Sequence, residues 1–161
     1  MEFSVSVMNY GDKPFDITMG MHTYFDISSL KNIQIEGPFK GSATTDKVSG
    51  AKGTADSNVI TITSPVDMLY SGVTGPLTIT DSGKVNPNFM LILHLMFFQG
   101  TKIIMESKGF PDSVLWNPYG NEAMGYDKFV CVEPVQASPI SIPADKNNVV
   151  KFYQKISCVK I

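Results

Sequence analysis

The sequence predicts an all-β protein, a single antiparallel β-sandwich. Short segments rich in β-branched and aromatic residues recur along the chain, and glycine, proline or asparagine separates them. No segment combines a 3.6-residue apolar period with capping residues, as an amphipathic helix would. The length of 161 residues suits one domain. We therefore expect many short strands packed in two layers.

The expected strands can be followed through the chain by their alternating apolar residues. Residues 40–57 are rich in Gly, Ser, Thr and Lys and are expected to form a long loop. Pro134 is expected to end the strand before it. The expected strands are residues 3–7, 15–21, 33–35, 59–63, 67–70, 76–80, 103–104, 114–116, 129–133, 140–142 and 149–159.

Composition excludes several classes of partner. The net charge is −2 and all 13 basic residues are lysines, which argues against a nucleic-acid or anionic-membrane surface. The longest apolar run, residues 89–98, is too short to span a bilayer, and the first residues do not resemble a signal peptide. Cys131 and Cys158 are expected to be reduced thiols. We expect a cytoplasmic protein without a cofactor or metal.

A histidine follows the clearest alternating segment. Residues 15–21 alternate apolar and polar side chains, which places His22 on the polar face with Gly20 and Tyr24. A histidine between a glycine and a tyrosine on an open sheet face suits a ligand site, because a flat molecule can approach the backbone at the glycine. The alternative is a surface or hydrogen-bonded structural histidine.

Several motifs resemble those of the hexose-6-phosphate mutarotases, the glucose-6-phosphate 1-epimerases of the aldose 1-epimerase superfamily. They are "NYGDKPFDITMGM" followed by "HTYF" (9–25), the weaker "VDMLY" (66–70), "GFPDSVLWNP" (109–118) and "FVCVEP" (129–134), in family order. The resemblance implies an antiparallel galactose-mutarotase-like supersandwich. It covers only the C-terminal portion of the family. We therefore expect residues 1–161 to form an incomplete sandwich that lacks the upstream half and self-associates through unpaired sheet edges.

The resemblance also implies an acid–base reaction. Mutarotation interconverts the α and β anomers of a sugar by moving protons at the anomeric hydroxyl and the ring oxygen. Glu133 is implied as the base and His22 as the acid, with Asp67 and Trp116 as substrate-binding residues. We expect the His22 and Glu133 tips to converge on one concave sheet face, about a sugar ring apart. The alternatives are a strand-end surface charge for Glu133, a turn residue after Pro65 for Asp67, and core packing for Trp116.

The substrate is expected to be an aldohexose or its 6-phosphate, with weak preference for the phosphate. Arginine, the usual clamp for phosphate, is absent, and Met68 stands where relatives carry an arginine. One alternative function is a non-catalytic carbohydrate-binding or structural remnant. Another explanation for the short chain is an incomplete gene model of a full enzyme.

Residues 85–99 are expected to be an insertion. They are apolar and low in charge, and they separate two segments that would follow each other almost directly in relatives. One hypothesis is a retained short intron, because fifteen codons keep the reading frame and the two ends could encode splice signals. The other is an ordinary buried strand or loop.

Overall fold

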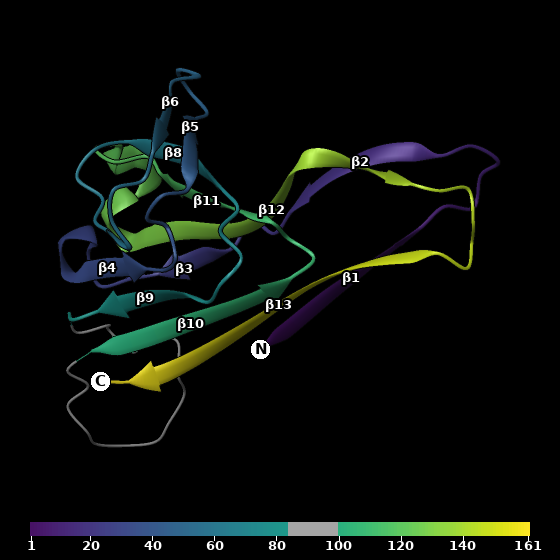
Figure 1. Cartoon of the computed structure of the whole chain (residues 1–161). Helices are drawn as coiled ribbons and strands as arrows, with labels where there is room; N and C mark the ends of the chain where they lie inside the picture. The colour runs from purple at the N-terminus through teal and green to yellow at the C-terminus, as the bar shows by residue number, and fades with distance from the viewer. Residues whose placement is uncertain (84–99) are drawn as a thin grey trace.

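A computed structural model describes residues 1–83 and 100–161. Antiparallel strands in two sheets make up most of this part of the chain (Figure 1). The predicted all-β antiparallel sandwich is therefore confirmed. The insertion predicted at residues 85–99 lies outside the described residues.

The first sheet has six strands. In spatial order they are β1 (Glu2–Met8), β13 (Val149–Lys160), β10 (Thr101–Lys108), β9 (Leu77–Asp81), β4 (Ile33–Glu36) and β7 (Val59–Ile60). β9 and β10 pair directly, with Asp81 opposite Thr101.

The second sheet has seven strands and carries the candidate site. Six lie in the order β2 (Phe15–Gly20), β12 (Phe129–Ile142), β11 (Asp112–Asn117), β8 (Val66–Ser71), β5 (Ala43–Asp46) and β6 (Lys52–Thr54). β3 (Tyr24–Asp26) also pairs with β12, beyond the end of β2. Three short 3-10 helices complete the described elements: η1 (Leu30–Asn32), η2 (Glu122–Met124) and η3 (Tyr126–Lys128). None of these helices is long and apolar enough to cross a membrane.

The hydrophobic core lies between the two sheets. Ile35 and Ile79 come from the first sheet, Leu115, Val130 and Val132 come from the second, and all five are fully buried. Each such side chain contributes roughly 1.5–3 kcal/mol on burial. Because successive strand residues face opposite ways, the residues between these core positions point to the outer face of the second sheet.

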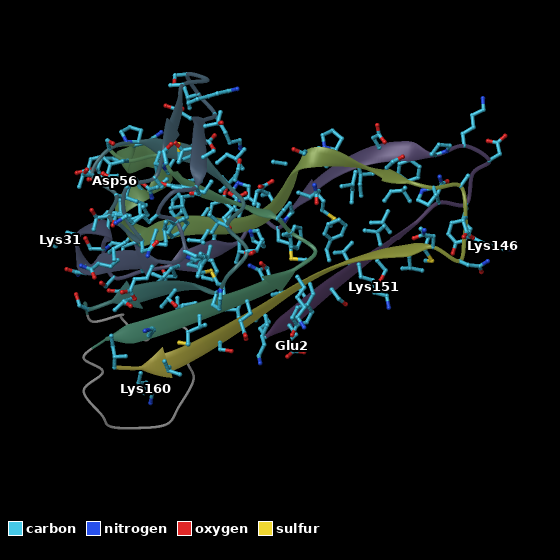
Figure 2. The ribbon with its side chains drawn as sticks, viewed as in Figure 1. Glu2, Lys31, Asp56, Lys146, Lys151 and Lys160 are labelled. Atoms are coloured by element: carbon cyan, nitrogen blue, oxygen red, sulfur yellow. The ribbon has the colours of Figure 1, made fainter. Side chains whose placement is uncertain are left out.

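Two strands of each sheet extend into a two-layered arm (Figure 1). It consists of β1, β2, the second half of β12 and the first half of β13, and Lys146 lies at its tip (Figure 2). The buried Asn9 side chain joins its turns by donating hydrogen bonds to the carbonyls of Lys13 (2.8 Å) and Ile142 (3.1 Å). Phe15, the first apolar residue of the alternating segment, is 42% exposed here. The reason is its place near the arm's tip, outside the main core.

The predicted loop at residues 40–57 is wrong. Part of it forms the β5–β6 hairpin, and the signal for its turn is Asp46 with Gly50. The Asp46 carboxylate accepts hydrogen bonds from the N–H groups of Val48 (2.8 Å) and Ser49 (3.2 Å), and Gly50 has a φ of 75°. An aspartate that binds its own following backbone, with a glycine in the left-handed region, stabilises a tight turn.

The predicted strand end at Pro134 is also wrong, because β12 continues to Ile142. β2 pairs with β12 from Val135 onward and β3 pairs with it up to Cys131. Pro134 therefore faces the break between β2 and β3, where its carbonyl accepts a hydrogen bond from Met21 N–H (3.1 Å). The missing N–H of proline removes no ladder hydrogen bond at this break.

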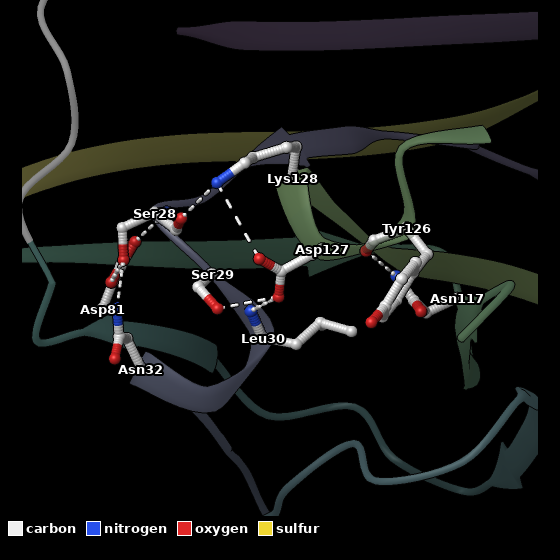
Figure 3. A network of polar contacts seen from close by, with 9 residues as sticks. All are labelled: Ser28, Ser29, Leu30, Asn32, Asp81, Asn117, Tyr126, Asp127 and Lys128. Atoms are coloured by element: carbon white, nitrogen blue, oxygen red, sulfur yellow. Dashed lines mark hydrogen bonds and ion pairs between the residues drawn. The ribbon is translucent and has the colours of Figure 1, made fainter. Parts of the chain in front are cut away.

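A polar network fixes the segment after β3 (Figure 3). The buried Asp81 carboxylate accepts hydrogen bonds from the Ser28 N–H (2.7 Å) and hydroxyl (2.6 Å). Asp127 accepts from the Ser29 hydroxyl (2.7 Å) and the Leu30 N–H (3.0 Å). Charge-assisted hydrogen bonds of this kind are stronger than neutral ones, so they fix the position at which β3 pairs with β12.

Asn117 joins the network to the start of β12. Its side-chain amide donates to the carbonyls of Tyr126 (2.9 Å) and Phe129 (2.8 Å), and Asn117 is 1% exposed. The loop between β11 and β12 is thereby closed over a buried polar side chain. This contact sets where Phe129 begins the strand that carries Glu133.

Candidate active site

A row of side chains crosses the outer face of the second sheet. Tyr24 lies opposite Cys131, Cys131 opposite Trp116, and Trp116 opposite Asp67, on four adjacent strands. Glu133 is two residues from Cys131 and shares its face. Three of the four predicted site residues, Asp67, Trp116 and Glu133, therefore meet on one face.

His22 joins this row from the connection between β2 and β3. β2 ends at Gly20, so His22 lies just beyond the strand. The prediction had placed it on the polar face of the strand itself. Its side chain is 53% exposed, and Nδ1 lies 3.2 Å from Glu133 Oε1. The imidazole stacks on Tyr24, with ring centres 4.8 Å apart at 6°, and meets the edge of Trp116 at 5.7 Å. The prediction that His22 and Glu133 share a face is confirmed.

The predicted separation of His22 and Glu133 is wrong. The two side chains are in direct contact at 3.2 Å and not a sugar ring apart. The physical reason is the attraction between the imidazole and the carboxylate, which draws an exposed side chain onto the buried Glu133.

Glu133 is a buried carboxylate with a raised pKa. Burial is the main cause, since it penalises the charged form, and the negative charge of Asp67 adds to it. The positive charges of His22 and Lys47 oppose the shift. The net result is a pKa above the ordinary 4.5, which makes the carboxylate a stronger base than one on the surface.

Asp67 is held by a lysine. Lys47 Nζ lies 3.3 Å from Asp67 Oδ1, and the Lys47 N–H donates to the Asp67 carbonyl (2.8 Å). Oδ1 is buried but receives no directed hydrogen bond from the described residues. The contact is thus an ion pair without a directed hydrogen bond. Met68, the next residue, packs against the hydrophobic core and faces away from the site.

Aromatic side chains form the floor of the site beside Glu133. Trp116 is half-buried on the outer face, with ring centres 6.0 Å from Tyr24 and 5.7 Å from Phe129. Tyr24 is 56% exposed. The alternatives for Trp116 were sugar binding and core packing. The ring packs against other aromatic rings, and it also lies on the open face of the sheet.

A groove of about 380 Å³ borders the pair on the same face. It is lined by Lys47, Leu69, Val114, Val135 and neighbouring residues of β2 and β12, and Val114 lies directly opposite Glu133. The volume is within the roughly 300–1,000 Å³ of small-molecule sites. Gly20 also lines the groove, and a Cβ there would lie 2.9 Å from a Val135 methyl. The glycine is thus required by strand packing as well as open to a ligand.

Three residues at the site were not predicted from the sequence. The sequence places Tyr24 on the face of His22 through its i+2 position but indicates no role for it at the site. Cys131 was expected to be an ordinary buried thiol, and burial does raise its pKa to about 12, with the Glu133 charge adding to the shift. Lys47 arrives on the unpredicted hairpin, and no motif in its surroundings signals its contact with Asp67.

The two sheets and their order define the class of fold, the β-sandwich of mutarotases and aldose 1-epimerases. A solved structure described as a "putative mutarotase" from Salmonella typhimurium superposes with a TM-score of 0.78 and 20% identity, over 99% of this chain and 50% of that one. A "putative aldose 1-epimerase" from Escherichia coli K12 gives 0.70 and 17%, over 99% and 56%. These likenesses establish the fold.

One curated protein is similar to this chain in sequence. It is named "Putative glucose-6-phosphate 1-epimerase", from Cenchrus ciliaris, and is 26% identical over 83% of this chain and 39% of its own length. No protein-family model matches the chain. The chain spans about two fifths of this relative and about half of the solved structures.

Proposed function

We propose that this chain catalyses mutarotation of an aldohexose or its 6-phosphate, with Glu133 as general base and His22 as general acid. The observation that carries the proposal is the contact between His22 Nδ1 and Glu133 Oε1 at 3.2 Å, beside a groove on the outer sheet face. A buried carboxylate with a raised pKa and an exposed imidazole are suited to exchange protons with one substrate near neutral pH.

The reaction needs two coupled proton transfers. The Glu133 carboxylate takes the proton of the anomeric hydroxyl while the His22 imidazolium gives its proton to the ring oxygen. The bond between C1 and the ring oxygen breaks, and C1 becomes an aldehyde. After the aldehyde has rotated, the ring oxygen adds to the other face of C1. Glu133 then gives its proton to the aldehyde oxygen, and His22 takes the proton of the attacking hydroxyl. Protons and electrons balance over the cycle, and both side chains return to their starting states.

The substrate must take the place of the contact between His22 and Glu133. His22 is able to move, because its side chain is 53% exposed and lies in a connection between strands. Glu133 is held on the long strand β12 with a side chain only 10% exposed. We propose that the imidazole swings outward as the anomeric centre enters, while the carboxylate stays fixed.

The neighbouring side chains supply contacts for the rest of the sugar. Asp67 accepts hydrogen bonds from hydroxyl groups, and its ion pair with Lys47 keeps it oriented. Trp116 and Tyr24 offer aromatic surface to the apolar face of a pyranose. This division between apolar floor and few polar groups is typical of small-molecule sites.

A second function, carbohydrate binding without turnover, is favoured by one observation. The acid and the base contact each other directly, and an ion pair that stayed closed would leave neither group for the substrate. The aromatic residues and Asp67 would still bind a sugar. The two functions therefore differ in whether His22 leaves Glu133 when the sugar enters.

Polarimetry of freshly dissolved α-D-glucose, and a coupled assay of glucose 6-phosphate with a β-specific dehydrogenase, test the proposal. We expect anomer interconversion above the spontaneous rate and proportional to protein concentration. Trp116 is the single tryptophan of the chain, so its fluorescence reports sugar binding at this site independently. Sugar-dependent fluorescence without faster interconversion would establish the second function in place of the first.

A further inference from the structure

Three side chains with different metal-binding atoms meet at the outer face of the second sheet. His22, Cys131 and Glu133 each offer one atom, and these atoms lie within 4.8 Å of one another. The imidazole Nδ1 and the carboxylate Oε1 are already 3.2 Å apart. Cys131 and Glu133 are neighbours on one face of β12, and Cys131 is a free thiol. The acid–base proposal uses two of these side chains and leaves the thiol unexplained.

The spacing is close to that of a zinc site. Zn²⁺ binds nitrogen, oxygen and sulfur at about 2.0–2.3 Å in tetrahedral geometry, which places neighbouring ligand atoms about 3.3–3.8 Å apart. The His22–Glu133 pair nearly meets this requirement, and the widest separation would have to close by about 1 Å. The His22 side chain is exposed and comes from a connection between strands, so it has room to move toward the two ligands on β12.

We propose that His22, Cys131 and Glu133 form a binding site for a thiophilic divalent cation, for which Zn²⁺ is the best fit, and that the bound ion stops the acid–base reaction. Sulfur and imidazole ligands favour Zn²⁺ over Mg²⁺ and Ca²⁺, which prefer six or more oxygen ligands. The ion replaces the thiol proton, which leaves to solvent. Three protein ligands leave a fourth position on the exposed side for water.

Inhibition follows from the identity of the ligands. The ion would take the lone pair of His22 Nδ1 and an oxygen of Glu133, the two groups on which proton transfer depends. This second part of the proposal rests on the proposed function, whereas the ion site itself does not. The metal here is a reversible inhibitor and not a cofactor of the reaction.

Cobalt(II) is the spectroscopic probe for the ion site. Titration of the full chain with Co²⁺ should give the visible bands of four-coordinate cobalt and a near-ultraviolet thiolate charge-transfer band, with one ion per chain. Zn²⁺ should remove both signals and Mg²⁺ should not. Cys131→Ser should abolish the charge-transfer band and weaken Zn²⁺ binding by at least about 10–100-fold, the loss that even an outer-shell change produces. Cys158→Ser is the matched control, because this second free thiol is exposed on β13.

One further variant protects the test. If the Cys131→Ser chain fails to fold, His22→Gln carries the same comparison, because the His22 side chain is half exposed. A charge-transfer band that disappears in Cys158→Ser and remains in Cys131→Ser would overturn the ion site. Unchanged Zn²⁺ affinity in His22→Gln would overturn it as well.

Measurement of mutarotation with and without Zn²⁺ separates the ion site from the proposed function. Metal signals that depend on Cys131 in a chain without mutarotation support the ion site and count against the proposed function. Mutarotation that continues unchanged when Zn²⁺ saturates the spectroscopic site would overturn the inhibitory part. Mutarotation that falls with Zn²⁺ occupancy and returns with a chelator is the expected result.

Discussion

Nδ1 of His22 and Oε1 of Glu133 lie 3.2 Å apart, although the His22 side chain is 53% exposed and that of Glu133 only 10%. The buried carboxylate is therefore partly neutralised by a side chain that is itself exposed. His22 lowers the pKa of Glu133 while it stays in contact, against the larger effect of burial. Movement of the imidazole toward a substrate would remove this opposition and make Glu133 a stronger base as the substrate arrives.

Removal of either member of the pair should nearly abolish mutarotation. We expect His22→Ala and Glu133→Gln each to lower kcat/KM by about 10²–10⁴-fold, the usual contribution of a general acid or base. Glu106→Gln is the control, since it makes the same chemical change in an exposed carboxylate paired with Lys155 on the other sheet. Either site variant retaining more than a tenth of the wild-type rate would rule out the assigned role.

Glu133→Gln should not destabilise the fold at neutral pH. The folded-state pKa of Glu133 is raised, so the folded chain binds its proton more tightly than the unfolded chain does. The free energy of unfolding of the wild type therefore falls as pH rises from about 4.5 through the folded pKa. The variant has no carboxyl group to titrate at this position. Its free energy of unfolding, relative to that of the wild type, should therefore increase over the same pH range. Thermal denaturation of both chains at several pH values measures the difference, and a midpoint difference, variant minus wild type, that is smaller at pH 7 than at pH 4 would contradict it.

The acid limb of the pH–rate profile should lie above the ordinary glutamate range. Glu133 must be ionised to act as a base, and burial raises its pKa above 4.5. We therefore expect kcat/KM to fall as pH drops through this raised value, at a pH where an exposed carboxylate would still be ionised. Measurement in buffers of constant ionic strength gives the midpoint. A limb at or below 4.5 would mean that another group sets it.

Local patterns predicted much of the fold and the face on which each member of the main pair lies. The alternation of residues 129–133 places Glu133 and Cys131 on one face, and the alternation before His22 directs it to the same face. The contact between these distant segments came from resemblance to a family, because alternation gives a face and not a partner. Their pairing depends on the register of β2 and β3 with β12, which is set by tertiary packing.

The parts that the sequence did not predict depend on long-range placement. Lys47 reaches Asp67 only because the β5–β6 hairpin pairs with β8, and the polar composition of that segment suggested a loop. Pro134 remains within β12 because it faces the break between β2 and β3, a circumstance that appears only in the assembled sheet. Propensity describes a residue's local preference, and neighbouring strands overrode it at both places.

A 6-phosphate should give little advantage to the substrate. The chain contains no arginine, and Met68, the residue after Asp67, packs against the core and faces away from a ligand on the outer face. A hydrogen bond to a charged group contributes about 1.5–3 kcal/mol, or roughly tenfold and more in affinity. We expect kcat/KM for glucose and glucose 6-phosphate to agree within about tenfold. Lys47→Gln should affect both sugars alike, and a selective loss for the phosphate would show that Lys47 binds it.

The chain should self-associate through the edges of its arm. Among the described residues, β1 is an edge strand of one sheet and β2 of the other, and the two lie together in the arm, so both sheets have an unpaired edge there. Phe3 and Phe15 on these strands are 43% and 42% exposed. Unpaired strands with exposed apolar residues favour pairing with another chain.

Light scattering across a concentration series should show oligomers that Phe3→Lys and Phe15→Lys shift toward monomer, because a charge on an edge strand opposes pairing. Val48→Lys is the control, since it adds the same charge at an 84% exposed residue in the β5–β6 turn. A wild-type chain that stays monomeric at high concentration, or equal effects of all three lysines, would exclude association through these edges.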